Sequence, residues 1–149
     1  MRLIETSVGE RLRSLLLPAL IVVATACGDS TGPELLVSFS VEPFDPASGS
    51  LPSVQAAAGD GTIAVEGGYW VACFGLTPSE IEGAAVLDEA GLQLQVGWRG
   101  NVAACVPGLA EFVYEAVVGN LDAGAYRLQV VHIVGQDVFS TLEQDLVVQ

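Results

Sequence analysis

Few side chains in this sequence are suited to catalysis. The 149 residues include one histidine, His132, and no lysine. By strand alternation His132 shares a face with Leu128 and Val130, so we expect it at the edge of a core rather than acting as a general base. Residues 75–79 could mimic a nucleophile turn, but no His–Asp pair lies near them in the sequence. We therefore predict no enzymatic activity and no cofactor, with a hydrolase as a remote alternative.

Carboxylates are the one abundant reactive group. Asp88 and Glu89 fall in a predicted hairpin loop, Glu80 and Glu82 sit close by, and Asp60 flanks a predicted strand. Calcium takes about six to eight oxygen ligands from such groups. The acids are dispersed, however, and no D-x-D-x-D-G series is present, so we expect solvated charge and no metal site. A calcium-dependent module that uses these acidic loops remains an alternative.

Three aromatic residues could form a stacking platform for sugars or peptides. Trp98 follows the inward phase of its predicted strand, so we expect it to fill the core. Trp70 is ambiguous, because a bulge at Gly67 and Gly68 would switch the face on which it lies. Tyr69 and Trp70 are the predicted ligand platform, and a carbohydrate-binding module is the alternative function that they suggest.

The charge of the chain excludes several partners. All basic residues but Arg99 and Arg127 lie within residues 1–26, and 16 of the 18 acidic residues lie after them, a net charge of −14 for residues 27–149. Such a field repels nucleic acid and anionic lipid headgroups. We expect no nucleic-acid partner.

Residues 1–26 have the composition of a secretory signal peptide. Arg11 and Arg13 precede an apolar run over residues 15–24, and residues 24–26 are the small residues Ala-Thr-Ala. A charged start, a short apolar middle and a small-residue cleavage site are typical of such signals. The run is much shorter than the roughly 20 residues of a spanning helix.

The cysteine directly after this segment resembles the acylation site of a bacterial lipoprotein. The resemblance implies that Cys27 becomes the lipidated N-terminus and that residues 27–34 form a polar tether. Several acyl chains would hold the protein on a membrane almost permanently. Gly28, in place of the Asp that retains lipoproteins at the inner membrane, implies the outer membrane. An ordinary Ala-x-Ala cleavage site with Cys27 as a leftover thiol is the other interpretation.

Residues 35–149 alternate apolar and polar side chains with the period of two that half-buried strands show. Turn signals separate the segments about every ten residues. Seven short strands in this pattern favour a single β-sandwich domain. The predicted strands cover residues 35–42, 62–74, 82–88, 92–99, 109–118, 126–134 and 138–148.

Cys73 and Cys105 are the two cysteines of this domain. In an exported domain of this size we expect them to form a disulfide. Closing the loop between them would stabilise the fold by about 3–4 kcal/mol in the chain-entropy treatment.

The segment Leu121-Asp-Ala-Gly-Ala-Tyr126 resembles the tyrosine corner of immunoglobulin-like and fibronectin-type domains. The resemblance implies a seven-stranded antiparallel Greek-key sandwich in which Gly124 permits the turn and the Tyr126 hydroxyl bonds back to the backbone. It places Cys73 at the end of the second strand and Cys105 before the fifth, two neighbouring strands. The disulfide differs from that of antibody domains, because residue 128 is Leu.

Taken together, these patterns predict a non-enzymatic cell-envelope lipoprotein that presents an immunoglobulin-like binding or scaffold module. Its expected partners are the membrane, through the lipid, and an envelope protein or glycan. On the outer face of the sandwich we also expect Arg99 to stand opposite Glu111.

Overall fold

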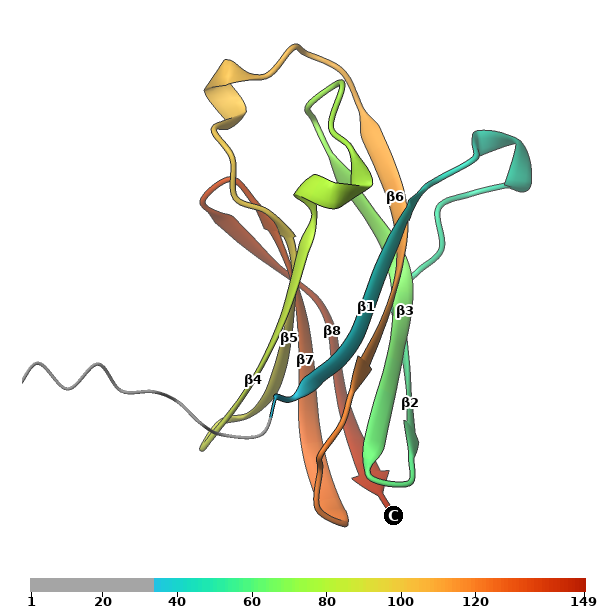
Figure 1. The fold of residues 1–149 in the computed structure, drawn as a ribbon, viewed down its shortest axis with the longest axis vertical. Helices are drawn as coiled ribbons and strands as arrows, with labels where there is room; N and C mark the ends of the chain where they lie inside the picture. Colours follow the sequence, from blue (N-terminus) through green and yellow to red (C-terminus); the bar gives the residue numbers. More distant parts are fainter. Residues whose placement is uncertain (1–33) are drawn as a thin grey trace, which may run out of the picture. The chain divides into compact units, whose positions relative to one another are not determined.

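The structure, a computed structural model, describes residues 34–149, and the predicted leader and Cys27 lie outside the described residues (Figure 1). The described chain is all-β, as predicted, and forms two four-stranded sheets. The strands are β1 (Leu36–Pro43), β2 (Gln55–Gly59), β3 (Thr62–Val71), β4 (Glu82–Asp88), β5 (Gly91–Trp98), β6 (Ala110–Val118), β7 (Gly124–Val134) and β8 (Asp137–Val148). Three single 3-10 turns lie in the loops: η1 (Pro46–Ser48), η2 (Pro78–Glu80) and η3 (Val102–Ala104).

The strand count corrects the prediction of seven, since the described residues contain eight strands. The additional strand is β2, which lies between the predicted strands over residues 35–42 and 62–74. Its alanine-rich sequence QAAAG has low strand propensity. It forms because Gly61, at φ +61°, closes a tight hairpin that pairs β2 with β3.

The predicted all-antiparallel pairing is also wrong at one place. Sheet 1 has the order β1-β6-β3-β2 and sheet 2 the order β4-β5-β7-β8. Within them β5 and β7 pair in parallel, with Leu92 opposite Leu128. After β5 the chain crosses to sheet 1 to form β6, and it returns as β7 running in the direction of β5. A parallel pair needs such a long connection, which alternation within a strand cannot reveal.

One hydrophobic core lies between the sheets. Each strand contributes alternate side chains to it, because successive residues of a strand point to opposite faces. Burying each large apolar side chain contributes about 1.5–3 kcal/mol relative to leaving it in water. The largest fully buried side chains are Tyr69, Tyr114, Ile63, Leu92, Leu94, Leu128, Val65, Val71, Val96, Val118, Val130 and Val148.

The predicted bulge at Gly67 and Gly68 is absent from β3. The pairing of β3 with β6 runs without a register shift, so Trp70 keeps the outward phase of its strand. The glycines are needed because the chain before β2 passes across them. The Gly68 amide donates to the Pro52 carbonyl at 2.9 Å, and a side chain at Gly68 would collide with Leu51.

The edges of the two sheets approach each other closely where β1 faces β4. A Cβ atom on Gly83 would lie 2.7 Å from the ring of Phe39. The absence of a side chain on Gly83 therefore lets the Phe39 ring close this side of the core.

The described chain begins and ends at one end of the sandwich, which we call the tether end (Figure 1). There Asn120 donates to the carbonyl of Glu34 at 2.8 Å, and the Gly61 amide donates to the carbonyl of Gln149 at 3.0 Å. At the opposite end, which we call the disulfide end, lie the β3–β4 loop and the β5–β6 loop (Figure 1).

Candidate functional site

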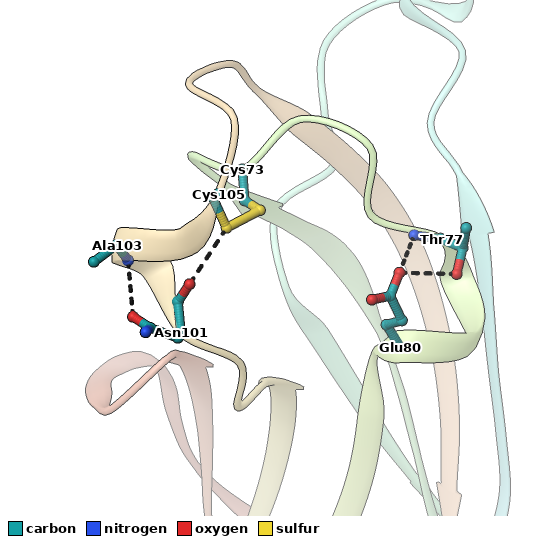
Figure 2. The surroundings of a disulfide bond; sticks show 6 residues. All are labelled: Cys73, Thr77, Glu80, Asn101, Ala103 and Cys105. Carbon is teal, nitrogen blue, oxygen red and sulfur yellow. Dashed lines mark hydrogen bonds between the residues drawn. A yellow bond between two sulfur atoms is a disulfide. The ribbon is translucent and has the colours of Figure 1, made fainter.

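The predicted disulfide between Cys73 and Cys105 is confirmed, with the two Cα atoms 5.2 Å apart (Figure 2). It links the β3–β4 loop to the β5–β6 loop. Next to it the Phe74 amide donates to the Val106 carbonyl at 2.9 Å, an isolated bridge outside the named strands. The two loops are thus joined by one covalent bond and one hydrogen bond.

Short caps order both loops (Figure 2). In the β3–β4 loop Glu80 accepts hydrogen bonds from the Thr77 amide at 2.8 Å and from the Thr77 hydroxyl at 3.0 Å. In the β5–β6 loop Asn101 Oδ1 accepts from the Ala103 amide at 3.0 Å, which caps η3. Such contacts satisfy backbone donors that would otherwise be unpaired at the start of each turn.

Val102 in η3 is 43% exposed, and near the end of β3 and in the two loops four large apolar side chains are more exposed: Trp70 at 57%, Phe74 at 66%, Val106 at 64% and Leu109 at 55% of their surface. We call these four residues the apolar tip. Trp70 lies opposite Glu111 of β6, and Leu109 directly precedes β6 at the same end of the sheet. Phe74 pairs with Val106 through their backbones.

The two loops that carry Phe74, Val106 and Leu109 are free of charge, and Glu111 is the acidic residue opposite Trp70. Neither residues 71–79 nor residues 100–110 include a charged side chain. Grouped exposed apolar side chains on a soluble domain mark an interaction site. The sequence analysis did not single out Phe74, Val106 or Leu109, although the absence of charge on both sides of each cysteine was a visible signal.

The structure separates the two residues of the predicted aromatic platform. Trp70 is exposed and belongs to the apolar tip. Tyr69 is fully buried, so its assignment to the platform is wrong: β3 continues its alternation through Gly68, which turns Tyr69 inward. The Tyr69 hydroxyl donates to the Ile133 carbonyl at 2.7 Å and accepts from the Trp98 amide at 3.1 Å. Desolvation by burial raises the pKa of Tyr69.

His132 lies in the core between the sheets, with 8% of its surface exposed. The rings of Tyr69 and Tyr114 lie nearly perpendicular to the His132 ring, with their centroids 5.3 and 5.6 Å from its centroid. Burial lowers the pKa of His132 to about 4, and burial raises the pKa of Tyr114. The expectation that His132 is a core residue is confirmed.

The acidic residues considered for calcium do not gather in one place. Glu80 and Glu82 lie at the start of β4, whereas Asp88 and Glu89 follow at its far end. Glu80 is engaged with Thr77, and Asp88 accepts from the backbone amides of its own turn. Within residues 34–149 no group of three or more His, Cys, Asp or Glu side chains is placed to hold a metal ion.

The outer face of sheet 2 carries a chain of polar side chains that the sequence analysis missed. Arg99 donates to Gln95, Gln95 to Gln93 and Gln93 to Gln129, each at 2.8 Å. Gln129 and Arg127 both donate to Glu143, each at 3.3 Å. Strand alternation places the glutamines on one face, but the partner strand could not be read from the sequence.

The predicted pairing of Arg99 with Glu111 is wrong. Glu111 lies on β6 in sheet 1, opposite Trp70 of β3, whereas Arg99 follows β5 in sheet 2. The error arises because β5 and β6 are consecutive in the chain but belong to different sheets.

The loop before β7 contains the hydrogen bond that a tyrosine corner makes. The Tyr126 hydroxyl donates to the Asp122 carbonyl, four residues upstream, at 3.0 Å. Gly124 begins β7 next to this contact, and no atom lies near the position that its side chain would occupy.

In residues 34–149 we find no helix with the length and apolar character needed to cross a membrane. Comparison with known proteins adds no relative: no family model, no curated protein and no solved structure matches this chain.

Proposed function

We propose that this protein is a non-enzymatic binding module of the cell envelope, lipidated at Cys27, which contacts a partner through its apolar tip. The observation that carries the proposal is the exposed cluster of Trp70, near the end of β3, with Phe74, Val106 and Leu109 on two uncharged loops that are joined by a disulfide. Joining the loops before binding reduces the entropy lost on binding, which favours recognition.

The position of the tip relative to the start of the domain supports this proposal. The described chain begins at the tether end, and the two loops that carry Phe74, Val106 and Leu109 lie at the disulfide end (Figure 1). A tether of residues 27–34 would reach at most about 26–29 Å when fully extended. A lipid at Cys27 would therefore hold the tether end near a membrane and leave the tip free to face away from it.

The finer assignment of the fold, an immunoglobulin-like sandwich, belongs to the same proposal. The hydrogen bond of Tyr126 with the Asp122 carbonyl supports it. The parallel pairing of β5 with β7 departs from the antiparallel pattern of that group. We propose a variant in which the corner is kept while the strand order of sheet 2 differs.

Crosslinking in intact cells tests the proposed contact. A photoreactive amino acid at position 74 or 106 should give a discrete crosslinked product, whereas the same group at position 147 should not. Val147 is a matched control, because it is also an apolar side chain on the domain surface, 69% exposed, but lies on β8 at the tether end. Equal products from all three positions, or none from positions 74 and 106, would contradict the proposal.

A neutral glycan is a second candidate ligand, and the exposure of Trp70 is the observation that favours it. A glycan stacked on the indole would depend on Trp70 and little on Phe74. Binding of envelope oligosaccharides that is abolished by Trp70→Ala and unchanged by Phe74→Ala would support the glycan and argue against a protein partner.

A calcium-dependent form of this module would show a melting temperature that rises when calcium is added. The dispersed positions of the acidic residues argue against such a form.

A further inference from the structure

We propose, on the basis of the proposed function, that the partner of the apolar tip is a protein segment in which apolar side chains are flanked by lysine or arginine. The inference rests on the charges that lie beside the tip and on the placement of the two arginines of the described domain.

The outer face of sheet 1 carries acidic side chains beside the tip and also beyond residues 51 and 52, which cross this face at Gly68. On β3, Glu66 lies four residues before Trp70 and on the same face, because side chains alternate. Glu66 stands directly opposite Glu115 of β6, and Glu111 stands opposite Trp70. Glu42 of β1 completes the set, and a shallow cavity of about 250 Å³ is lined by Glu42, Glu66 and Glu115.

No cation of the described domain neutralises this surface. Arg99 is bonded to Gln95 and Arg127 to Glu143, and both interactions lie on sheet 2. Like charges directly opposite on neighbouring strands, such as Glu66 and Glu115, repel each other. A ligand that brings positive charge to this surface would relieve the repulsion, whereas the tip itself offers only apolar contact.

This arrangement discriminates among the possible occupants of the tip. A second copy of the chain would bring an equally acidic surface against the first, and an anionic bilayer would be repelled in the same way. A segment with apolar and basic side chains satisfies both parts of the surface.

Calorimetric titration of the purified full-length protein with a designed peptide tests the inference. The probe is an 18-residue amphipathic peptide of leucine and lysine, compared with one in which glutamate replaces lysine and one in which serine replaces leucine. We expect the leucine–lysine peptide to bind at least tenfold more tightly than either control. Its affinity should fall as salt is raised, because the charges are screened.

Two pairs of variants separate specific recognition from general attraction to an acidic protein. Phe74→Ser with Val106→Ser, which leaves the charge unchanged, should weaken binding at least tenfold. Glu66→Gln with Glu115→Gln should weaken it at least fivefold, whereas Asp137→Asn with Asp145→Asn, the same charge change on β8, should alter it less than twofold. Circular dichroism and melting of each variant establish that it is folded.

Equal effects of the two charge variants, no effect of the serine variant, or equal binding of the glutamate peptide would overturn the inference. Dimerisation that depends on concentration, or cosedimentation with neutral phosphatidylcholine vesicles, would assign the tip to another occupant and overturn the inference as well, provided that the effect is lost in the variant with serine at positions 74 and 106. If one of these results is found while position 74 still crosslinks in cells, the proposed function stands and only the chemistry of the partner is wrong. If position 74 gives no crosslinked product either, the proposed function and this inference both fail.

Discussion

The Nε2 atom of His132 lies 3.1 Å from the hydroxyl oxygen of Tyr114, and this pair joins the two sheets inside the core. One partner comes from β7 and the other from β6. The only buried polar side chain with a charge that changes near neutral pH in the described domain is therefore held between the layers. Its protonation should be linked to the stability of the whole sandwich.

Acidification should destabilise the protein through His132. Its pKa is lowered from 6.5 to about 4 in the folded state, so the unfolded state binds the proton more tightly. The contribution is fully present above pH 6.5 and is lost as the pH falls from 6.5 to 4, by up to about 3 kcal/mol. Urea unfolding at pH 7 and pH 4.5 measures the loss. His132→Gln, which cannot titrate, should show a smaller difference between the two pH values; an equal difference would refute the linkage.

Removal of the disulfide should destabilise the domain by about 3–4 kcal/mol. The bond links residues 32 apart in sequence and restricts the unfolded chain. Urea unfolding of Cys73→Ser with Cys105→Ser, compared with wild type, measures the effect. Reductant should lower the stability of wild type to that of the double variant and leave the double variant unchanged. A variant as stable as wild type would contradict the expected role of the bond.

Gly83→Val should cost about 1–3 kcal/mol, because a side chain here collides with the ring of Phe39 and overpacks the junction of β1 and β4. Ala84→Val is the matched control, since Ala84 is the next residue of β4 and is exposed. Thermal unfolding should show a lower midpoint for the glycine variant alone. Equal midpoints for the two variants would mean that the contact with Phe39 does not restrict this edge.

Tyr126→Phe should lower stability by about 1 kcal/mol, the net contribution of a typical hydrogen bond. The change removes only the hydroxyl that donates to the Asp122 carbonyl. Tyr69→Phe should cost more in the same unfolding assay, because it leaves the buried Trp98 amide and the Ile133 carbonyl without their partner. If Tyr126→Phe lowers stability more than Tyr69→Phe does, the corner contributes more than its one hydrogen bond.

Cys27→Ala should abolish incorporation of labelled fatty acid and release the protein from membranes. The expected reason is that the thiol of Cys27 carries the lipid, so that no other residue can replace it. Radiolabelling of wild type and variant, followed by membrane fractionation, measures both effects. The variants with serine at positions 73 and 105 should still be labelled; wild type without label would exclude the lipoprotein assignment.

The strand pattern and the disulfide could be predicted from the sequence because each depends on local chemistry. Alternation in β5 and β6 follows from which side chains avoid water, and it was visible without knowledge of any partner strand. The pairing of Cys73 with Cys105 could be predicted because residues 35–149 contain only these two cysteines. The loop turn at Tyr126 was likewise recognisable from neighbouring residues.

Pairing between distant strands was decided only by the tertiary structure. The parallel register of β5 with β7 and the position of Glu111 opposite Trp70 depend on which sheet each strand joins. The apolar tip exists because two loops far apart in the chain meet at one end of the sandwich and leave Phe74 and Leu109 outside the core. The alternation of apolar and polar residues shows that one face of a strand is buried, but it carries no information about the neighbour against which that face packs.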